Sequence, residues 1–202
     1  MKLLLVVLIG YLLGSLSPSA LIGKIKKVDL RKEGTKNLGA SNTMYIFGKF
    51  FGALVMVFDI AKAFAAVKIA GLILPELSFA GIFAGCAAVV GHVFPFYLKF
   101  RGGKGMASFA GIILALDPFI FLVLFITTIA LILIVDYGVA MPMSAGVLFP
   151  IFYGLRHPDP VCIAAATLVS ILILIKHAPN VKKAVRGEDV RISDIIRPKK
   201  QK

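Results

Sequence analysis

The sequence predicts an all-α integral membrane protein with seven transmembrane helices, and its composition, hydropathy and charge distribution support this class. Apolar residues make up 59% of the 202 residues, and only 16% are charged. The mean hydropathy of +0.93 indicates more apolar surface than a soluble domain of this length buries. The net charge of +13 gathers between the apolar stretches, which favours membrane loops over nucleic acid binding. We therefore expect membrane lipids as partners and no nucleic acid.

Seven apolar segments follow one another along the chain, at 3–23, 50–74, 78–98, 105–116, 119–135, 138–155 and 161–176. A helix of ~20 residues crosses the ~30 Å hydrocarbon layer. The fourth segment would cover only about 18 Å as a helix, so it is either a half-helix or a crossing extended through the glycine-rich loop before it. No internal repeat is visible. Residues 1–202 are expected to form one polytopic domain, with 177–202 as a basic cytoplasmic tail.

The basic residues predict the orientation of these segments. Seven Lys and Arg residues lie in 24–49, three in 98–105 and nine in 176–202. The positive-inside rule places these regions and the C-terminus in the cytoplasm, with the N-terminus outside. Residues 1–10 imitate a signal peptide. Cleavage near Ala20 would export the basic loop, so we expect a retained first helix and an odd number of crossings.

A first polar loop, 29–43, combines glycines with hydroxyl, amide and basic side chains. Such a loop offers many hydrogen-bond donors to a phosphate group. The alternative is a solvated basic loop beside anionic lipid headgroups. The candidate binding residues are Thr35, Lys36, Asn37, Gly39, Ser41 and Asn42.

A second cluster is the glycine-rich stretch Phe100-Arg-Gly-Gly-Lys-Gly-Met-Ala-Ser108, which opens the fourth apolar segment. Glycines let the backbone approach a ligand closely, and N–H groups at a helix start attract anions. With Arg101 and Lys104 beside Gly102, Gly103 and Gly105, a phosphate site is favoured over a plain helix connection. His92 lies just before this loop, where support of the loop is favoured over direct chemistry.

A third polar segment, 176–189, follows the last apolar segment. His177 in this segment is either a general base, a partner for an oxyanion, or a solvated interfacial histidine. Asp59 and Lys62 lie three residues apart within an apolar segment, so we expect an ion pair that packs helices. Cys86 and Cys162 are expected to be buried thiols, and no metal site is predicted.

Three motifs in this order resemble the bacterial acyl-phosphate:glycerol-3-phosphate acyltransferases of the PlsY type. The first runs from Gly34 to Asn42 with Gly48-Lys49 following, the second covers 91–105, and the third covers 177–180 with Gly187-Glu188 beyond. The resemblance implies seven transmembrane helices in a bacterial inner membrane, with the active site on the cytoplasmic face. It also implies transfer of a fatty acyl group from acyl phosphate to the 1-hydroxyl of glycerol 3-phosphate, with lysophosphatidic acid and phosphate as products. No cofactor is implied.

The resemblance also assigns roles to individual residues. Lys104, His177 and Asn180 are the expected catalytic residues, and proton removal falls either to His177 or to a substrate phosphate. Glu188 is expected to support its loop by pairing with a cation. Asp59 and Lys62 keep a structural role. The expected substrate-binding residues are Thr35, Lys36, Asn37, Gly39, Ser41, Asn42, Lys49, His92, Arg101, Gly102, Gly103 and Gly105.

The chain departs from the family pattern at a few positions. Lys36 stands where the family has glycine, and Tyr45 stands where it has an arginine that binds substrate phosphate. Tyrosine cannot replace a bidentate cation, although Lys36 or Lys49 would compensate for the charge. Lys183 and Ala178-Pro179 also differ from the usual residues. Two other functions stay open: a small transporter of anions or phosphate esters, and a non-catalytic lipid-binding paralogue.

Overall fold

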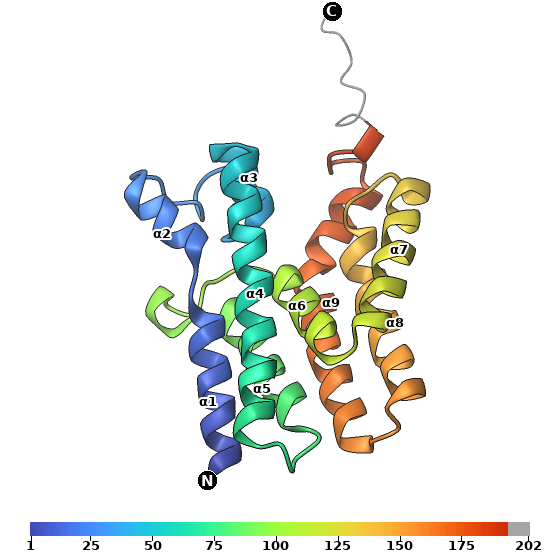
Figure 1. Cartoon of the computed structure of the whole chain (residues 1–202). Helices are drawn as coiled ribbons and strands as arrows, with labels where there is room; N and C mark the ends of the chain where they lie inside the picture. Colours follow the sequence, from blue (N-terminus) through green and yellow to red (C-terminus); the bar gives the residue numbers. More distant parts are fainter. Residues whose placement is uncertain (194–202) are drawn as a thin grey trace, which may run out of the picture. The chain divides into compact units, whose positions relative to one another are not determined.

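The computed structural model describes residues 1–193, and within that range it contains helices and no strand. This confirms the prediction of an all-α chain. Two compact units divide the chain at Pro118, one covering 1–118 and the other beginning at Phe119. Figure 1 shows the order of the helices in both units.

Among residues 1–193, five helical segments are long and apolar enough to cross a membrane. They are Lys2–Ile25, Lys49–Ile73, Ala80–Leu98, Pro118–Val135 and Pro160–Val185. Two further apolar helices are shorter: α6 (Met106–Leu116) has 11 residues and α8 (Ala140–Arg156) has 17. Each predicted apolar segment thus contains at least one helix. Seven crossings and the orientation of the termini stay predictions.

The first span is broken, whereas the sequence predicts one continuous helix over 3–23. Helix α1 (Lys2–Ser15) ends before α2 (Pro18–Ile25) begins. Ser17 caps α2 by accepting a hydrogen bond from the Ala20 N–H at 3.3 Å, and Pro18 occupies the first helical position. Both residue types are typical of a helix start, and proline cannot continue the ladder of the helix before it. These two residues are the physical reason for the break.

Side chains from other helices satisfy the carbonyl groups that the break exposes. Lys62 Nζ on α4 (Lys49–Ile73) donates to Leu16 O at 2.6 Å, and Tyr97 Oη donates to Ser15 O at 2.8 Å. Unpaired backbone groups are costly in an apolar medium. The break is therefore supported by two specific contacts within the first unit.

Close packing of small residues joins α1 to α5 (Ala80–Val93). Cβ atoms added at Gly10 and Gly14 would collide with the backbone of Ala84 and Ala88. Glycines four residues apart let two membrane helices approach each other closely. Figure 1 shows α1 beside α5 and α4 in this unit. The contact holds the first span against the helix that leads to the glycine-rich loop.

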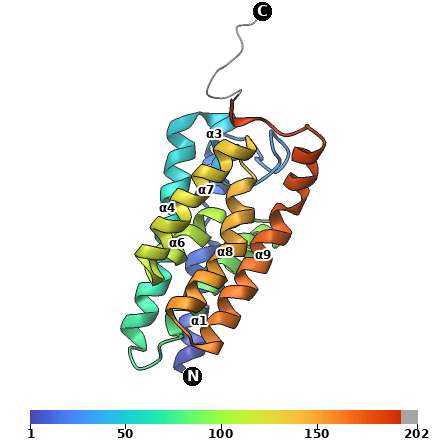
Figure 2. The same ribbon diagram turned by 90° about the vertical axis from the view of Figure 1, so that its right-hand side faces the viewer.

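The second unit consists of α7 (Pro118–Val135), α8 and α9 (Pro160–Val185). Asp159 caps α9 by accepting from the N–H groups of Val161 and Cys162 at 2.8 and 3.2 Å. Figure 2 shows α8 and α9 running antiparallel beside each other. The sequence predicts that the last helix ends near residue 176, and this is wrong. Helix α9 continues to Val185 with Pro179 inside it, so 177–185 is helical and not a tail.

Residues 191–193 are attached to the α7–α8 connection of the same unit. The Asp136 carboxylate accepts from the Ser193 N–H at 2.8 Å and from Ser193 Oγ at 2.6 Å. These hydrogen bonds lower the pKa of Asp136. The Ile192 N–H donates to Asp136 O at 3.1 Å. The first part of the chain beyond α9 is thus fixed at one end of the α7–α8 pair.

Candidate functional site

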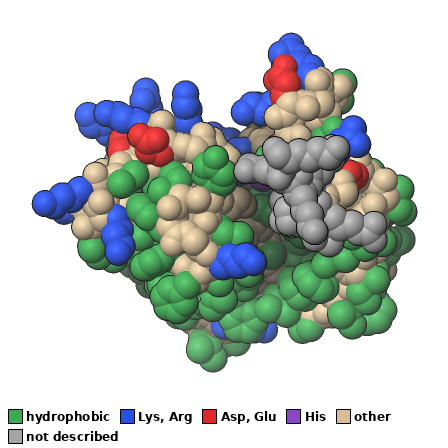
Figure 3. All heavy atoms as spheres, turned by 90° about the horizontal axis from the view of Figure 1, so that it is seen from above, with side chains coloured by type: hydrophobic (Ala, Val, Ile, Leu, Met, Phe, Trp, Pro, Cys, Tyr) green, Lys and Arg blue, Asp and Glu red, His purple; other side chains and the backbone are tan. Residues whose placement is uncertain are grey.

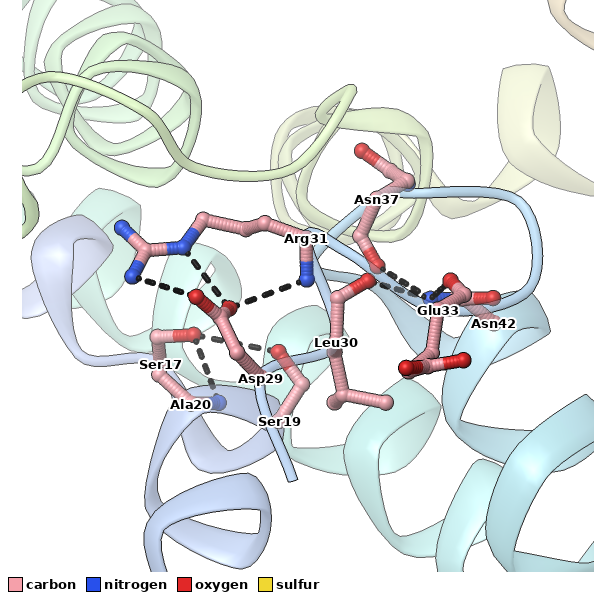
Figure 4. A network of polar contacts seen from close by, with 9 residues as sticks. All are labelled: Ser17, Ser19, Ala20, Asp29, Leu30, Arg31, Glu33, Asn37 and Asn42. Carbon is pink, nitrogen blue, oxygen red and sulfur yellow. Dashed lines mark hydrogen bonds and ion pairs between the residues drawn. The ribbon is translucent and has the colours of Figure 1, made fainter. Parts of the chain in front are cut away.

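The carboxamide of Asn42 organises the first polar loop from inside. Asn42 lies on α3 (Ala40–Phe47) and is fully buried. Its Oδ1 atom accepts from the Thr35 N–H at 2.7 Å. Its Nδ2 atom donates, at 2.8, 3.1 and 3.0 Å, to the carbonyl oxygens of Leu30, Glu33 and Asn37. Figure 4 shows these carbonyl contacts converging on Asn42. One side chain therefore holds residues 30–37 in a closed turn.

Left-handed backbone conformations make this turn possible. Gly34 and Lys36 both have a φ of +57°. A Cβ atom at Gly34 would also collide with Asn42 Oδ1 and lie 3.0 Å from Tyr45 Cδ1. Residues with a Cβ atom adopt this conformation at a cost of ~1–2 kcal/mol. Lys36 thus occupies a backbone position that favours glycine.

The glycine-rich loop folds back onto the end of α5. The Gly102 N–H donates to Val93 O and the Gly103 N–H donates to His92 O, both at 3.1 Å. Two N–H groups that the sequence offers to a phosphate are therefore bound to the protein backbone. Gly105, with a φ of +88°, ends the loop as the N-cap of α6.

The first and second sequence motifs lie in direct contact. A Cβ atom at Gly103 would collide with Leu38 O from the first loop and with His92 Nε2 from α5. Glycine is the residue that permits this approach. The structure thus brings together two segments that are about sixty residues apart in the chain, and it does so at a position where only a hydrogen fits.

Helix α6 begins at this contact without a side-chain cap. Its first N–H groups therefore form an end of positive potential beside the half-buried Lys104. Ser108 lies in the first turn, fully buried, and its Oγ atom has no hydrogen-bond partner among residues 1–193. Ser108 is not among the site residues predicted from the sequence. A sequence signal for Ser108 does exist: it is the third residue of a helix that follows a basic, glycine-rich loop.

Basic side chains surround the first loop. Exposed Lys and Arg residues in 24–49 comprise Lys24, Lys26, Lys27, Arg31, Lys32, Lys36 and Lys49. Blue side chains stand out over the α2 part of the molecule in Figure 3. Asp29 offsets part of the charge, since Arg31 Nε lies 2.9 Å from its Oδ1 atom. The hydrogen bonds from Arg31 lower the pKa of Asp29.

The other predicted residues of the first loop face different surroundings. Thr35, Ser41 and Lys49 are exposed, whereas Asn37 is half-buried and Gly39 is buried. Gly39 precedes α3, and its carbonyl accepts from the Thr43 N–H and hydroxyl at 3.0 and 2.9 Å. Tyr45 is 77% exposed. Arg101, at the start of the second motif, is exposed as well.

A buried polar cluster lies beneath the glycine-rich loop. Asp59 Oδ1 lies 2.7 Å from Lys62 Nζ, which forms the predicted ion pair, and 3.3 Å from His92 Nδ1. Lys62 Nζ lies 3.0 Å from His92 Nδ1. All three side chains are at least nine-tenths buried. The pair therefore contacts the residue that touches Gly103, a link that sequence spacing does not reveal.

His177 and Asn180 belong to the second unit, on α9, and are three residues apart on the helix. His177 is buried, and its Nδ1 atom lies 2.9 Å from Ile173 O. Because a carbonyl only accepts, Nδ1 carries a proton, and the lone pair of the neutral ring is on Nε2. Glu188 is exposed and forms no ion pair with residues 1–193, in contrast to the expected cation pairing.

The chain is similar in sequence to known proteins over nearly its whole length. Residues 4–187 match a family model described as glycerol-3-phosphate acyltransferase. A glycerol-3-phosphate acyltransferase of Macrococcus caseolyticus is 35% identical over 196 residues, which cover 95% of this chain and 98% of the relative. One from Staphylococcus aureus strain RF122 is 33% identical over 201 residues, or 95% and 98% of the two chains.

Two solved structures are similar in fold. The crystal structure of PlsY, an integral membrane glycerol 3-phosphate acyltransferase, in its glycerol 3-phosphate form has a TM-score of 0.89 and 30% identity, covering 97% of this chain and 98% of that one. Its lysophosphatidic acid form has a TM-score of 0.85 and 30% identity over 95% of each chain. The likeness therefore extends over nearly all of the chain.

Proposed function

Because this chain belongs to the glycerol-3-phosphate acyltransferase family, we propose that it transfers a fatty acyl group from acyl phosphate to the 1-hydroxyl of glycerol 3-phosphate. The products are lysophosphatidic acid and inorganic phosphate. Related PlsY structures in glycerol 3-phosphate and lysophosphatidic acid forms support this acceptor and product.

The contact of Gly103 with Leu38 and His92 is the observation that carries the proposal. It joins a basic loop to an uncapped helix start, which together form a site of strong positive potential. An acyl phosphate and glycerol 3-phosphate are both anions and repel each other. A site of this charge offsets the repulsion and aligns the two reactants.

Glycerol 3-phosphate binds at the start of α6. Lys104 and the N–H groups of the first helical turn hold its phosphate, since the N–H groups of Gly102 and Gly103 already donate to Val93 O and His92 O. The Ser108 hydroxyl, which has no partner among the described residues, donates from within that turn. Arg101, Thr35, Lys36, Ser41 and Lys49 supply the remaining polar and basic contacts.

His177 acts as the general base through Nε2. The acceptor hydroxyl attacks the acyl carbonyl, a new ester C–O bond forms, and the bond between the carbonyl carbon and the phosphate oxygen breaks. The hydroxyl proton moves to His177, and the phosphate leaves with the electron pair of the broken bond. Because an acyl phosphate is already activated, no acyl-enzyme is required. Asn180 orients the hydroxyl, and Lys104 stabilises the developing negative charge.

Asn42 shapes the binding loop and does not contact substrate in this account. Its carboxamide is buried and hydrogen-bonded to four backbone groups of the loop. Asn37 and Gly39 likewise define the path of the chain into α3. The loop therefore arrives preformed, which reduces the entropy lost on binding.

The membrane arrangement follows from the same assignment. Seven crossings with the N-terminus outside bring the basic loop, the glycine-rich loop and the C-terminal end of α9 to the cytoplasmic face. The whole chain then acts as one catalytic domain. The acyl chain lies between helices, with its phosphate at the membrane surface.

The proposed reaction is tested by comparing acyl donors and by identifying which hydroxyl of glycerol 3-phosphate is acylated. The purified protein in lipid vesicles is given labelled glycerol 3-phosphate with palmitoyl phosphate, palmitoyl-CoA or palmitoyl-acyl carrier protein. Mass spectrometry then identifies the product. Formation of 1-acyl product from palmitoyl phosphate alone is the expected result. Product from either thioester, or none from the acyl phosphate, would refute the proposed donor.

A further inference from the structure

His92 joins the buried ion pair to the glycine-rich loop through its two ring nitrogens. Nδ1 lies 3.0 Å from Lys62 Nζ and 3.3 Å from Asp59 Oδ1. Nε2 faces Gly103, where an added Cβ atom would collide with it. His92 is only 8% exposed. The ring therefore presents one buried nitrogen to the ion pair and one to the loop.

The surroundings of Lys62 determine where the proton of His92 lies. A lysine ammonium has three N–H donors and no lone pair. Three acceptors surround Lys62 Nζ: Leu16 O at 2.6 Å, Asp59 Oδ1 at 2.7 Å and His92 Nδ1 at 3.0 Å. For Nδ1 to accept, it must carry no proton, so the neutral ring has its proton on Nε2.

A proton on Nδ1 would give a poorer arrangement. The N–H group would then have only the more distant Asp59 Oδ1, at 3.3 Å, as an acceptor. It would also lie 3.0 Å from the lysine ammonium, and one ammonium N–H would lose its acceptor. Two facing donors in a buried site leave a polar group unsatisfied. The geometry of the cluster therefore favours the form in which Nε2 is the donor toward the loop.

We propose that Asp59 and Lys62 fix His92 as the Nε2–H tautomer, and that this N–H donates to the phosphate group of glycerol 3-phosphate bound at the start of α6. The inference rests on the proposed function. It makes Asp59 and Lys62 positioning residues, beyond their role in helix packing, and His92 a ligand of the substrate. Gly103 allows the contact because it has no side chain.

Two substitutions of His92 separate the roles of its nitrogens. In His92→Gln the side-chain amide nitrogen can reach the position of Nε2, whereas in His92→Asn the shorter amide reaches only the position of Nδ1. We expect His92→Asn to raise the KM for glycerol 3-phosphate roughly tenfold or more, with kcat and the KM for acyl phosphate nearly unchanged. His92→Gln should stay within roughly threefold of the wild type.

The opposite pattern would overturn the proposal. If His92 only supports the ion pair, Asn is the better replacement, and any loss in His92→Gln follows the thermal stability and affects both substrates. Equal KM values for glycerol 3-phosphate in the wild type and both variants would also overturn it. Thermal unfolding of each variant, measured in the same detergent, distinguishes a loss of binding from a loss of folding.

Nitrogen-15 NMR of histidine-labelled protein tests the tautomer without relying on catalysis. The His92 signals, assigned with His92→Asn, should show a protonated Nε2 and an unprotonated Nδ1. Titration with glycerol 3-phosphate should shift the Nε2 resonance. In Lys62→Met, Asp59 is left as the partner of Nδ1, so the proton should move to Nδ1. A protonated Nδ1 in the wild type, or no shift of Nε2 at saturating glycerol 3-phosphate, refutes the inference even if acyl transfer is observed.

Discussion

The Oδ1 atom of Asn42 accepts a 2.7 Å hydrogen bond from the backbone N–H of Thr35, while the nitrogen of the same carboxamide binds three loop carbonyls. A helix residue thus determines the shape of a loop that precedes it in the chain. The sequence motif suggests that Asn42 binds substrate directly, whereas in the structure its side chain holds the loop backbone. Substitution of Asn42 distinguishes these two roles.

Asn42→Ala should open this loop. Four backbone groups would lose their partner, which we expect to cost about 2–4 kcal/mol of folding free energy. Trypsin should then cleave faster after Lys32 and Lys36, and acyl transfer should fall. Proteolysis followed by mass spectrometry measures the effect, with Ser41→Ala as a neighbouring control that keeps the loop closed. A variant of Asn42 that resists trypsin like the wild type, yet loses activity, would instead make Asn42 a substrate ligand.

Lys36→Gly should stabilise the protein. Lys36 has a φ of +57°, so glycine removes backbone strain of ~1–2 kcal/mol from the folded state. Glycine also makes the unfolded chain more flexible, which offsets part of this gain. A net gain of about 0.5–1 kcal/mol is expected. Lys36→Ala is the matched control, because it removes the charge and keeps the strain. Thermal unfolding should rank glycine above both lysine and alanine; equal stability of the glycine and alanine variants would contradict the explanation.

Tyr45→Arg should improve the use of glycerol 3-phosphate. Tyr45 is exposed on α3 beside Gly34, so a guanidinium at this position lies next to the binding loop. A charge-assisted hydrogen bond to phosphate would lower the KM by roughly tenfold with little change in kcat. Tyr45→Lys should give a smaller effect, since an ammonium cannot bind two oxygens in a planar fork. An unchanged KM in both variants would show that Tyr45 lies away from the phosphate.

Gly103→Ala should strongly reduce the rate of acyl transfer, because it disrupts the contact between the first and second motifs. The added methyl group would collide with Leu38 O and His92 Nε2, so one of the two segments must move. Gly71→Ala on α4 is the control, because its added Cβ atom meets nothing within 4 Å and alanine favours a helix. Initial rates should fall at least about 100-fold in the first variant and stay at the wild-type level in the second. Wild-type rates in Gly103→Ala would refute the role of the contact.

The sequence predicted the helical class and the two motifs that meet at Gly103, because apolar runs and glycine clusters are local signals. It did not predict the break at Ser17, since the flanking apolar residues continue without a change in hydropathy. Nor did it indicate that Asn42 faces the loop or that Lys62 reaches Leu16 O. These contacts depend on the tertiary arrangement. Helix α9 extends to Val185 although Pro179 lies within it, which a local rule for proline disfavours.

Binding of the acceptor at the start of α6 is the central step of the proposed function. It is tested most directly by acyl transfer from palmitoyl phosphate to labelled glycerol 3-phosphate by the purified protein in lipid vesicles. The wild type is compared with Lys104→Ala and with Lys68→Ala, a control on α4 whose Nζ donates to Ala115 O at 2.8 Å.

We predict lysophosphatidic acid from the wild type and from Lys68→Ala, and a rate at least about 100-fold lower from Lys104→Ala. No product from folded wild-type protein, or equal rates from all three proteins, would contradict the account.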